Sequence, residues 1–420
     1  MKIQSINTAI ALTLLSVGFS QTAHSQTTSP NYAQLTQQVA VLRAQGPQGL
    51  ETFLNTHAQE LKNPSPQMRE ALDKLCQQRD CYASKLYWYT DLEQAKAAAK
   101  ASNKPILSLR LLGNLDQDLS CANSRFFRVA LYPNAEISKF LRDRYILHWQ
   151  SVRPVPKVTI DFGDGRKLER TITGNSIHYI LDSSGEPVDA IPGLYGPQAF
   201  LRQLGGGEKA VKEYTNSTGV ARASFLRDYH RQQLASSQRQ WGADLAKLGI
   251  KNLPRLVEIP GNNETPNAAV AGTLAVSKMR VESPLLRNLN LATSNQTALQ
   301  EITDSAKWQR IAQLYTADAK LDNNSVALIR SKRFQATKAD NLQRVVGNFE
   351  TVMALDTIRN EYTLHNQIHQ WFMQGNATNN VNTLNEKVYA ELFLTPNSDP
   401  WLGLMSNENY SAIDNDGIRK

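Results

Sequence analysis

The sequence predicts an α/β domain, with a central mixed sheet flanked by helices, followed by a mainly α-helical region. Residues 84–207 alternate between short apolar runs of strand length and segments with helical spacing. Two pairs of apolar runs in this part enclose turn residues, which is typical of hairpins. From residue 208 onward, long polar segments carry apolar residues at helical intervals. The two parts of the chain are therefore expected to differ in structural class.

The first residues, 1–25, are typical of a secretory signal peptide. A positive residue is followed by an apolar segment over residues 6–19 and by the small-x-small cleavage sequence AHS at 23–25. An N-terminal membrane anchor is the alternative, but the apolar segment is short for a span of about 20 residues. We expect a periplasmic or secreted protein, without stable membrane insertion after cleavage.

Composition gives a weaker indication of partners. The chain has 420 residues and a net charge of +8. Its basic residues are scattered among acidic ones and form no polybasic run, so we expect no nucleic-acid partner.

The elements of the α/β part can be predicted in order. Residues 26–83 before it read as short helices, broken at Pro64 and Pro66 and resuming over 67–75. Residues 86–89 are expected to form a short strand or a strand-like entry. Strands are then expected at 106–112, 145–149, 158–162, 168–172, 177–181 and 188–191. Helices are expected at 91–100, from 121, at 135–144 and at 197–204. The glycines 205–207 are expected to end the last helix.

The C-terminal region, 208–420, is expected to contain helices joined by polar loops. The predicted helices lie within 208–247 and at 297–316, 322–333 and 338–373. Three prolines within 252–267 indicate a linker or long loop.

The order of elements resembles the thioredoxin-like fold over residues 84–205. The resemblance rests on Trp88 and Tyr89 before the first helix, the helix 91–100, the sequence NKPIL at 103–107, and the closing pair of strands. It is nearest to the secreted or spermatogenesis-associated type of thioredoxin-like domain. It implies three mature parts: N-terminal helices at 26–83, a thioredoxin-like domain at 84–207, and the helical region 208–420.

Two departures from this family bear on function. Its oxidoreductases carry C-x-x-C at the strand-to-helix junction, where this chain has Cys121 followed by Ser124. They also carry a cis-proline before the third core strand, where this chain has Gly174, Asn175 and Ser176. A second thiol normally releases a trapped mixed disulfide. The departures therefore predict a thioredoxin-fold protein without dithiol exchange, which binds an exported client or an envelope partner.

The alternative is a monothiol enzyme or client trap that uses Cys121. A helix N-terminus favours the thiolate, and Ser124 would donate a hydrogen bond to the sulfur. Four residues are expected to form the binding surface around it: Trp88, Tyr89, Asn175 and Ser176. A purely structural role for Cys121 is favoured over this alternative, because cysteine is among the most buried residue types.

The mature chain has three cysteines, so an oxidising compartment leaves one unpaired. Cys76 and Cys81 can pair if the segment between them is not a straight helix. Pairing of Cys81 with Cys121 is the main rival.

A metal site is not expected from the sequence. His365 and His369 lie four residues apart, a spacing that can chelate zinc, with Glu361 nearby. No third ligand is evident and the neighbouring residues are apolar, so a packed helix–helix contact is favoured. We therefore expect no metal and no other cofactor.

Overall fold

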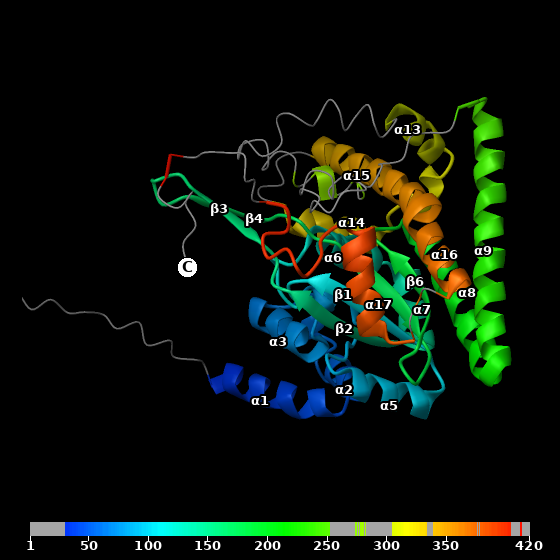
Figure 1. Ribbon diagram of the computed structural model, residues 1–420. Helices are drawn as coiled ribbons and strands as arrows, with labels where there is room; N and C mark the ends of the chain where they lie inside the picture. The colour runs from blue at the N-terminus through cyan, green and yellow to red at the C-terminus, as the bar shows by residue number, and fades with distance from the viewer. Residues whose placement is uncertain are drawn as a thin grey trace, which may run out of the picture.

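The protein is described by a computed structural model over residues 30–252, 274, 276, 278–280, 282, 305–333, 339–375, 377, 379–404 and 412–413. Its centre is a four-stranded mixed sheet in the order β2-β1-β5-β6. The strands are β1 (Ile106–Leu112), β2 (Ile146–Arg153), β5 (Ile177–Leu181) and β6 (Pro187–Pro192). Helices surround the sheet, and a helical region follows it (Figure 1). The predicted mixed sheet flanked by helices and the helical C-terminal region are thus confirmed.

The central strand β1 explains how the sheet is arranged. All seven of its residues are buried, as expected for a strand covered on both faces. It pairs parallel with β2 and antiparallel with β5, and β5 pairs antiparallel with β6. The parallel connection passes through α6 (Ala122–Phe126), the π-helical turn η2 (Phe127–Leu131) and α7 (Ala135–Arg144). The sequence signal for these elements was local, and their positions agree with the prediction.

The N-terminal helices form a small core of their own. They are α1 (Pro30–Ala44), α2 (Pro47–Thr56), the 3-10 turn η1 (Glu60–Lys62), α3 (Pro66–Cys76) and α4 (Cys81–Ser84). This core includes Phe53 and Leu72, and Tyr87 joins it. In Figure 1 these blue helices lie below the sheet.

Cys76 and Cys81 form a disulfide that joins the end of α3 to the start of α4. Gln77 and Asp80 between them have φ of 54° and 66°, so the chain turns there and does not continue as a straight helix. Cys121 is free, so the rival pairing is not formed.

Residues 86–89 do not form a regular strand. The Trp88 N–H donates to the carbonyl of Cys76, which turns this segment toward α3. Only Tyr89 reaches the sheet, through a single bridge to His148 on β2. The helix that follows, α5 (Leu92–Ser102), begins as predicted, with the Asp91 side chain accepting from the Gln94 N–H at 2.8 Å.

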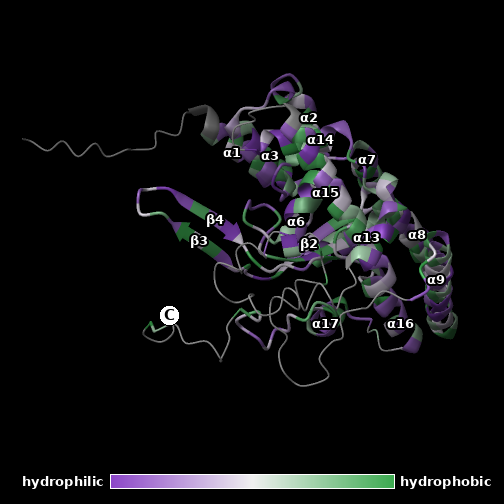
Figure 2. Cartoon of the chain, turned by 90° about the horizontal axis from the view of Figure 1, so that it is seen from above, coloured by the Kyte–Doolittle hydropathy of each residue, from purple (hydrophilic) through white to green (hydrophobic). Residues whose placement is uncertain are grey.

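The first predicted hairpin extends away from the sheet. It consists of β3 (Lys157–Asp161) and β4 (Lys167–Thr171), which pair only with each other. Both views show it on the side of the molecule opposite to the long helix α9 (Gly219–Leu248) (Figures 1 and 2).

The helix after β6 is longer than predicted. α8 runs from Pro197 to Asn216, through the three glycines that were expected to end it. A Cβ on Gly207 would lie 2.1 Å from Cδ1 of Ile180 on β5, whereas one on Gly206 would meet no atom within 4 Å. The absence of a side chain at Gly207 therefore permits close packing of α8 on the sheet.

The described C-terminal region is helical, as predicted. It contains α9, α13 (Ser305–Gln313), the 3-10 turn η3 (Thr316–Ala319), α14 (Asn323–Ser331), α15 (Ala339–Arg359), the π-helical turn η4 (Asn360–His365), α16 (Asn366–Gln374), α17 (Val381–Lys387) and the π-helical turn η5 (Val388–Leu392). Residues 253–267 of the predicted linker and 297–304 of a predicted helix lie outside the described residues. One apolar core joins the sheet to these helices. Within the described part of the chain, every helix is too short or too polar to span a bilayer.

Adjacent glycines in α8 allow a test of this packing. We expect Gly206→Ala to stabilise the protein by about 0.5–1 kcal/mol, because alanine favours a helix and open space surrounds this position. We expect Gly207→Ala to be less stable than Gly206→Ala by about 1–3 kcal/mol, because its Cβ overpacks against Ile180. Denaturant unfolding followed by circular dichroism measures both. Equal stability of the two variants would contradict the assigned role of Gly207.

Candidate functional site

Cys121 lies at the N-cap of α6, just after the loop that follows β1. Its N–H donates to the carbonyl of Leu112, and its side chain is fully buried. The sulfur lies 2.9 Å from Oγ of Ser176 and 3.3 Å from Oγ of Ser124. The structure thus brings together three of the predicted site residues, but it encloses the thiol.

The loop opposite Cys121 has an unusual backbone. Thr173 has φ of 57°, a conformation that costs a β-branched residue about 1–3 kcal/mol. The next residue is Gly174, and a Cβ there would lie 2.4 Å from Cβ of Cys121. Glycine therefore occupies the place opposite the thiol because the two chain segments approach so closely.

The expected binding surface around Cys121 is not exposed in this structure. Trp88, Asn175 and Ser176 are buried, and only Tyr89 is partly exposed. The Trp88 Nε1–H donates to Oε1 of Gln78 at 2.8 Å, directed into the protein. This part of the prediction is corrected: three of the four residues belong to the interior.

The C-terminal region covers the loop at Asn175. The hydroxyl of Tyr389, on η5, donates to the Asn175 carbonyl at 2.7 Å, and the Asn175 amide donates to the Phe393 carbonyl at 3.3 Å. Tyr389 and Phe393 follow Asn175 by more than two hundred positions in the sequence, so no local pattern indicated this contact.

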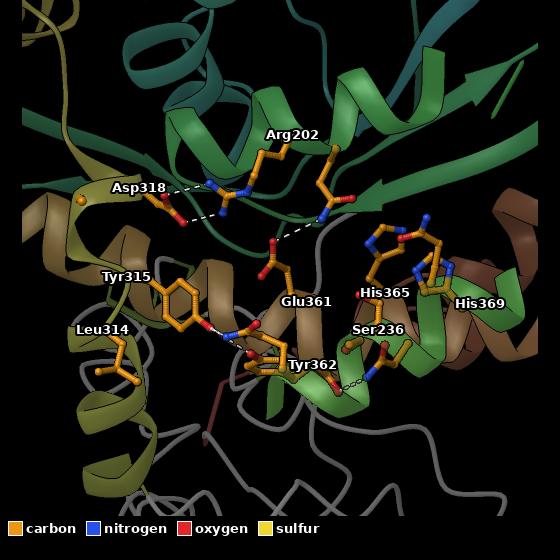
Figure 3. Close-up of a pocket in the computed structure, with 15 residues that line it drawn as sticks. Arg202, Ser236, Leu314, Tyr315, Asp318, Glu361, Tyr362, His365 and His369 are labelled. Atoms are coloured by element: carbon orange, nitrogen blue, oxygen red, sulfur yellow. Dashed lines mark hydrogen bonds and ion pairs between the residues drawn. The ribbon is translucent and has the colours of Figure 1, made fainter. Parts of the chain in front are cut away.

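A polar cavity of about 460 Å³ lies elsewhere, between the helices that pack beyond β6 (Figure 3). Its walls come from α8, α9, η3, η4 and α16. The lining residues are Arg202, Gln203, Gln233, Ser236, Ser237, Gln240, Leu314, Tyr315, Ala317, Asp318, Glu361, Tyr362, His365, Asn366 and His369. Among the residues singled out from the sequence, it contains Glu361, His365 and His369.

The charged side chains on one side of this cavity form hydrogen bonds with neighbouring side chains. Arg202 donates two hydrogen bonds to Asp318, at 2.9 and 2.5 Å. Glu361 accepts from Nε2 of Gln203 at 3.2 Å (Figure 3). Burial raises the pKa of Glu361 despite the opposing influence of Gln203 and Arg202. The carboxyl group of Glu361 is therefore suited to exchange a proton closer to neutral pH than an exposed glutamate.

Two tyrosines on the opposite side are fixed by one buried carboxylate. Oδ2 of Asp244 accepts from the hydroxyls of Tyr315 and Tyr362, the latter at 2.6 Å, and Oδ1 accepts from Gln240 at 3.0 Å. Burial and the hydrogen bond to Asp244 raise the pKa of Tyr315 to about 12. Both hydroxyls are thus directed to Asp244, which fixes how the rings lie in the cavity wall.

A buried Asp–His cluster lies next to the cavity. Asp189 is on β6, and its Oδ1 accepts from the Ala190 N–H at 2.8 Å and from Nε2 of His365 at 3.0 Å. Its Oδ2 accepts from the hydroxyl of Tyr229, on α9, at 2.7 Å. Burial would raise the pKa of Asp189, but the interactions with His365 outweigh it and the pKa lies below its usual range. The carboxylate is therefore charged at neutral pH.

Two further histidines extend this cluster. Nε2 of His230, on α9, lies 3.0 Å from the Val188 carbonyl, and its Nδ1 lies 2.8 Å from Nδ1 of His369, on α16. Burial lowers the pKa of His230 to about 4 and also lowers the pKa of His369, so both rings are neutral at pH 7. The carbonyl can only accept, so His230 carries its proton on Nε2 and His369 donates from Nδ1 to His230.

Asp189, His230 and His369 offer ligand atoms that all lie within 4.8 Å of one another. From the sequence, His365 and His369 were expected to pack at a helix–helix contact and to bind no metal; in the structure, His365 donates to Asp189. The other ligand candidates could not be found by spacing, since they lie on a strand and on a separate helix. The feature of the sequence that could have indicated this cluster is Asp189, an acidic residue within an apolar strand. All six residues of that strand are buried in the structure.

Comparison with protein-family models, with curated proteins and with solved structures found no match to this chain. The functional interpretation therefore rests on the geometry of the two places described above.

The burial of Cys121 predicts a simple thiol count. Under non-reducing conditions the native protein should show no titratable thiol, because the Cys121 side chain has no exposed area. Denaturant alone should release one thiol, and denaturant with reductant should release three, two of them from the disulfide. Reaction with a chromogenic disulfide reagent measures this.

Cys121→Ala is the matched control, since it should remove the thiol that denaturant alone releases and leave the other two. One reactive thiol in the folded wild-type protein would contradict the enclosed position of Cys121.

Proposed function

We propose that this is an exported binding protein built on a thioredoxin-like domain, and that its ligand site is the polar cavity rather than the thiol. The single observation that carries the proposal is the cavity of about 460 Å³ with converging polar side chains. Cys121, in contrast, has no exposed area.

The thioredoxin-like assignment is supported by connectivity. A parallel strand–helix–strand unit, β1 to β2, is followed by an antiparallel pair, β5 and β6, and by α8. This agrees with the element order on which the resemblance rests. Ser124, one turn from Cys121, supplies a hydroxyl where the family has a second thiol. These features favour a domain that no longer performs dithiol exchange.

The monothiol alternative is less favoured on geometry. A thiol that traps client proteins must be reachable by another disulfide. Cys121 is fully buried, and its sulfur already has the hydroxyls of Ser124 and Ser176 as neighbours. A protein client would have to displace the surrounding chain before it could react.

The chemistry of the cavity indicates its ligand. Arg202 and Asp318 neutralise each other, and Glu361 is paired with an amide. The remaining lining is rich in amide and hydroxyl groups, which both donate and accept. We therefore propose a small, neutral, polyhydroxylated ligand, since such a molecule needs both kinds of partner and no countercharge.

The test compares two glutamines on α8. Gln203 lines the cavity, whereas Gln198 donates to Glu136 outside it. We expect purified protein to bind members of a set of neutral mono- and disaccharides in calorimetry. Gln203→Leu should weaken that binding about tenfold or more, because it removes both hydrogen-bonding groups of the amide, and Gln198→Leu should leave it unchanged.

Absence of saturable binding across the saccharide set would reject the proposed ligand class. Equal binding by the Gln203→Leu and Gln198→Leu variants would show that the saccharide binds elsewhere.

Export is a separate part of the proposal. The Cys76–Cys81 disulfide is suited to an oxidising compartment, and residues 1–25 read as a signal peptide. We expect the chain expressed in a Gram-negative bacterium to be recovered from the periplasm or medium with Gln26 at its N-terminus, as determined by mass spectrometry. Deletion of residues 6–19 should retain it in the cytoplasm. Full-length, uncleaved protein in the cytoplasm would contradict export.

A further inference from the structure

We propose that Asp189, His230 and His369 form a binding site for a divalent cation of the zinc class. These residues come from β6, α9 and α16, and all three are buried. Two imidazoles and one carboxylate are a ligand set that Zn²⁺ uses with a fourth position open to water or substrate. The inference deepens the proposed function, because the cation would lie beside the same cavity.

The hydrogen bonds of His230 resemble those of a metal ligand. A histidine that binds a metal through one ring nitrogen usually donates the other N–H to a carbonyl or carboxylate. Nε2 of His230 donates to the Val188 carbonyl at 3.0 Å, which leaves the lone pair of Nδ1 directed at His369. This partner fixes both the tautomer and the orientation of the ring.

Asp189 is also held in a defined orientation. The Ala190 N–H, Nε2 of His365 and the Tyr229 hydroxyl surround its two oxygens. Hydrogen bonds of this kind orient a ligating carboxylate. The same contacts hold both carboxylate oxygens in place beside the two histidines.

His369 completes the site through a change of tautomer. Its Nδ1 lies 2.8 Å from Nδ1 of His230, and one proton lies between the two nitrogens. If that proton moves to Nε2 of His369, the ring stays neutral and both Nδ1 atoms have free lone pairs. Zn–N bonds of about 2.0–2.1 Å at a tetrahedral angle place two nitrogens about 3.3 Å apart, so the rings must separate by roughly half an ångström.

The position of His369 connects this site to the cavity. His369 lines the cavity together with His365 and Glu361 (Figure 3). A cation bound to His369 would therefore lie behind the wall of the cavity, and His369 would connect the two sites.

The test measures metal binding without any organic ligand. Full-length mature protein is stripped with a chelator and titrated with Zn²⁺ in a calorimeter and with Co²⁺ in a spectrophotometer. We expect one Zn²⁺ per chain and Co²⁺ d–d absorption of a four- or five-coordinate site. Asp189→Asn and His369→Gln should each weaken binding at least 100-fold, and His57→Gln, in the N-terminal helices, should leave it unchanged.

Tyr229→Phe keeps the aromatic ring and removes only the hydrogen bond to Asp189, so it serves if the two ligand variants fail to fold. We expect it to weaken Zn²⁺ binding by about 10- to 100-fold. Absence of stoichiometric Zn²⁺ and Co²⁺ binding by the wild-type protein would overturn the inference. Unchanged binding by folded His369→Gln, or by Tyr229→Phe, would also overturn it.

The Gln203→Leu variant separates this inference from the proposed function. It should bind Zn²⁺ like the wild type, since the Gln203 amide donates to Glu361, which is not one of the three ligands. In the wild-type protein, saccharide binding without Zn²⁺ binding would reject the cation site alone, and Zn²⁺ binding without saccharide binding would reject the saccharide ligand alone.

Discussion

The charge of Asp189 is the constraint on which the rest of the structure depends. A carboxylate in a fully buried strand is costly unless hydrogen-bond donors surround it. β6 supplies one donor from its own backbone, and the others come from Tyr229 on α9 and His365 on η4. The sheet therefore cannot keep this residue charged without the C-terminal helices. These donors connect β6 to α9 and to η4, which continues into α16, and the cavity lies between these helices and α8.

Other polar groups of the sheet join it to the helical region in the same way. Arg110, in the centre of β1, is almost fully buried and donates to Asn382 near the start of α17. Asn360 donates to the Leu194 carbonyl just beyond β6. The α/β part and the helices share one core. Near Cys121, Tyr389 and the Phe393 carbonyl cover the loop that contains Asn175. In a free-standing α/β domain, the loop that contains Asn175 would not be covered by η5.

The sequence was informative where the determining contacts are local. Apolar runs and capping residues predicted β1, the hairpin β3–β4 and the start of α5 at Asp91. The prediction failed where a residue distant in sequence determines the local structure. The Trp88 N–H donates to Cys76 at the end of α3, so this segment forms no strand. Gly207 packs against Ile180 on β5, so the glycines do not end the helix. The Asp–His cluster combines residues from four elements, β6, α9, η4 and α16, and contacts between separate elements produce no periodic pattern in the sequence. The sequence showed only the four-residue spacing of His365 and His369, which was interpreted as a packed helix–helix contact and gave no indication of Asp189 or His230.

The π-helical turn η4 joins α15 and α16 into one continuous helix, and it makes this helix sensitive to the number of residues it contains. A π turn accommodates one residue more than the α-helix around it, and each residue of an α-helix corresponds to a rotation of about 100°. The π turn therefore changes the rotation of α16 about the helix axis relative to α15. In this arrangement α15 packs on α13, and α16 packs on α9. Losing one residue from Asn360–His365 would restore a continuous α-helix and rotate His369 out of register with Asp189. An insertion or deletion between the two halves would therefore move the histidines of η4 and α16 away from Asp189 on β6.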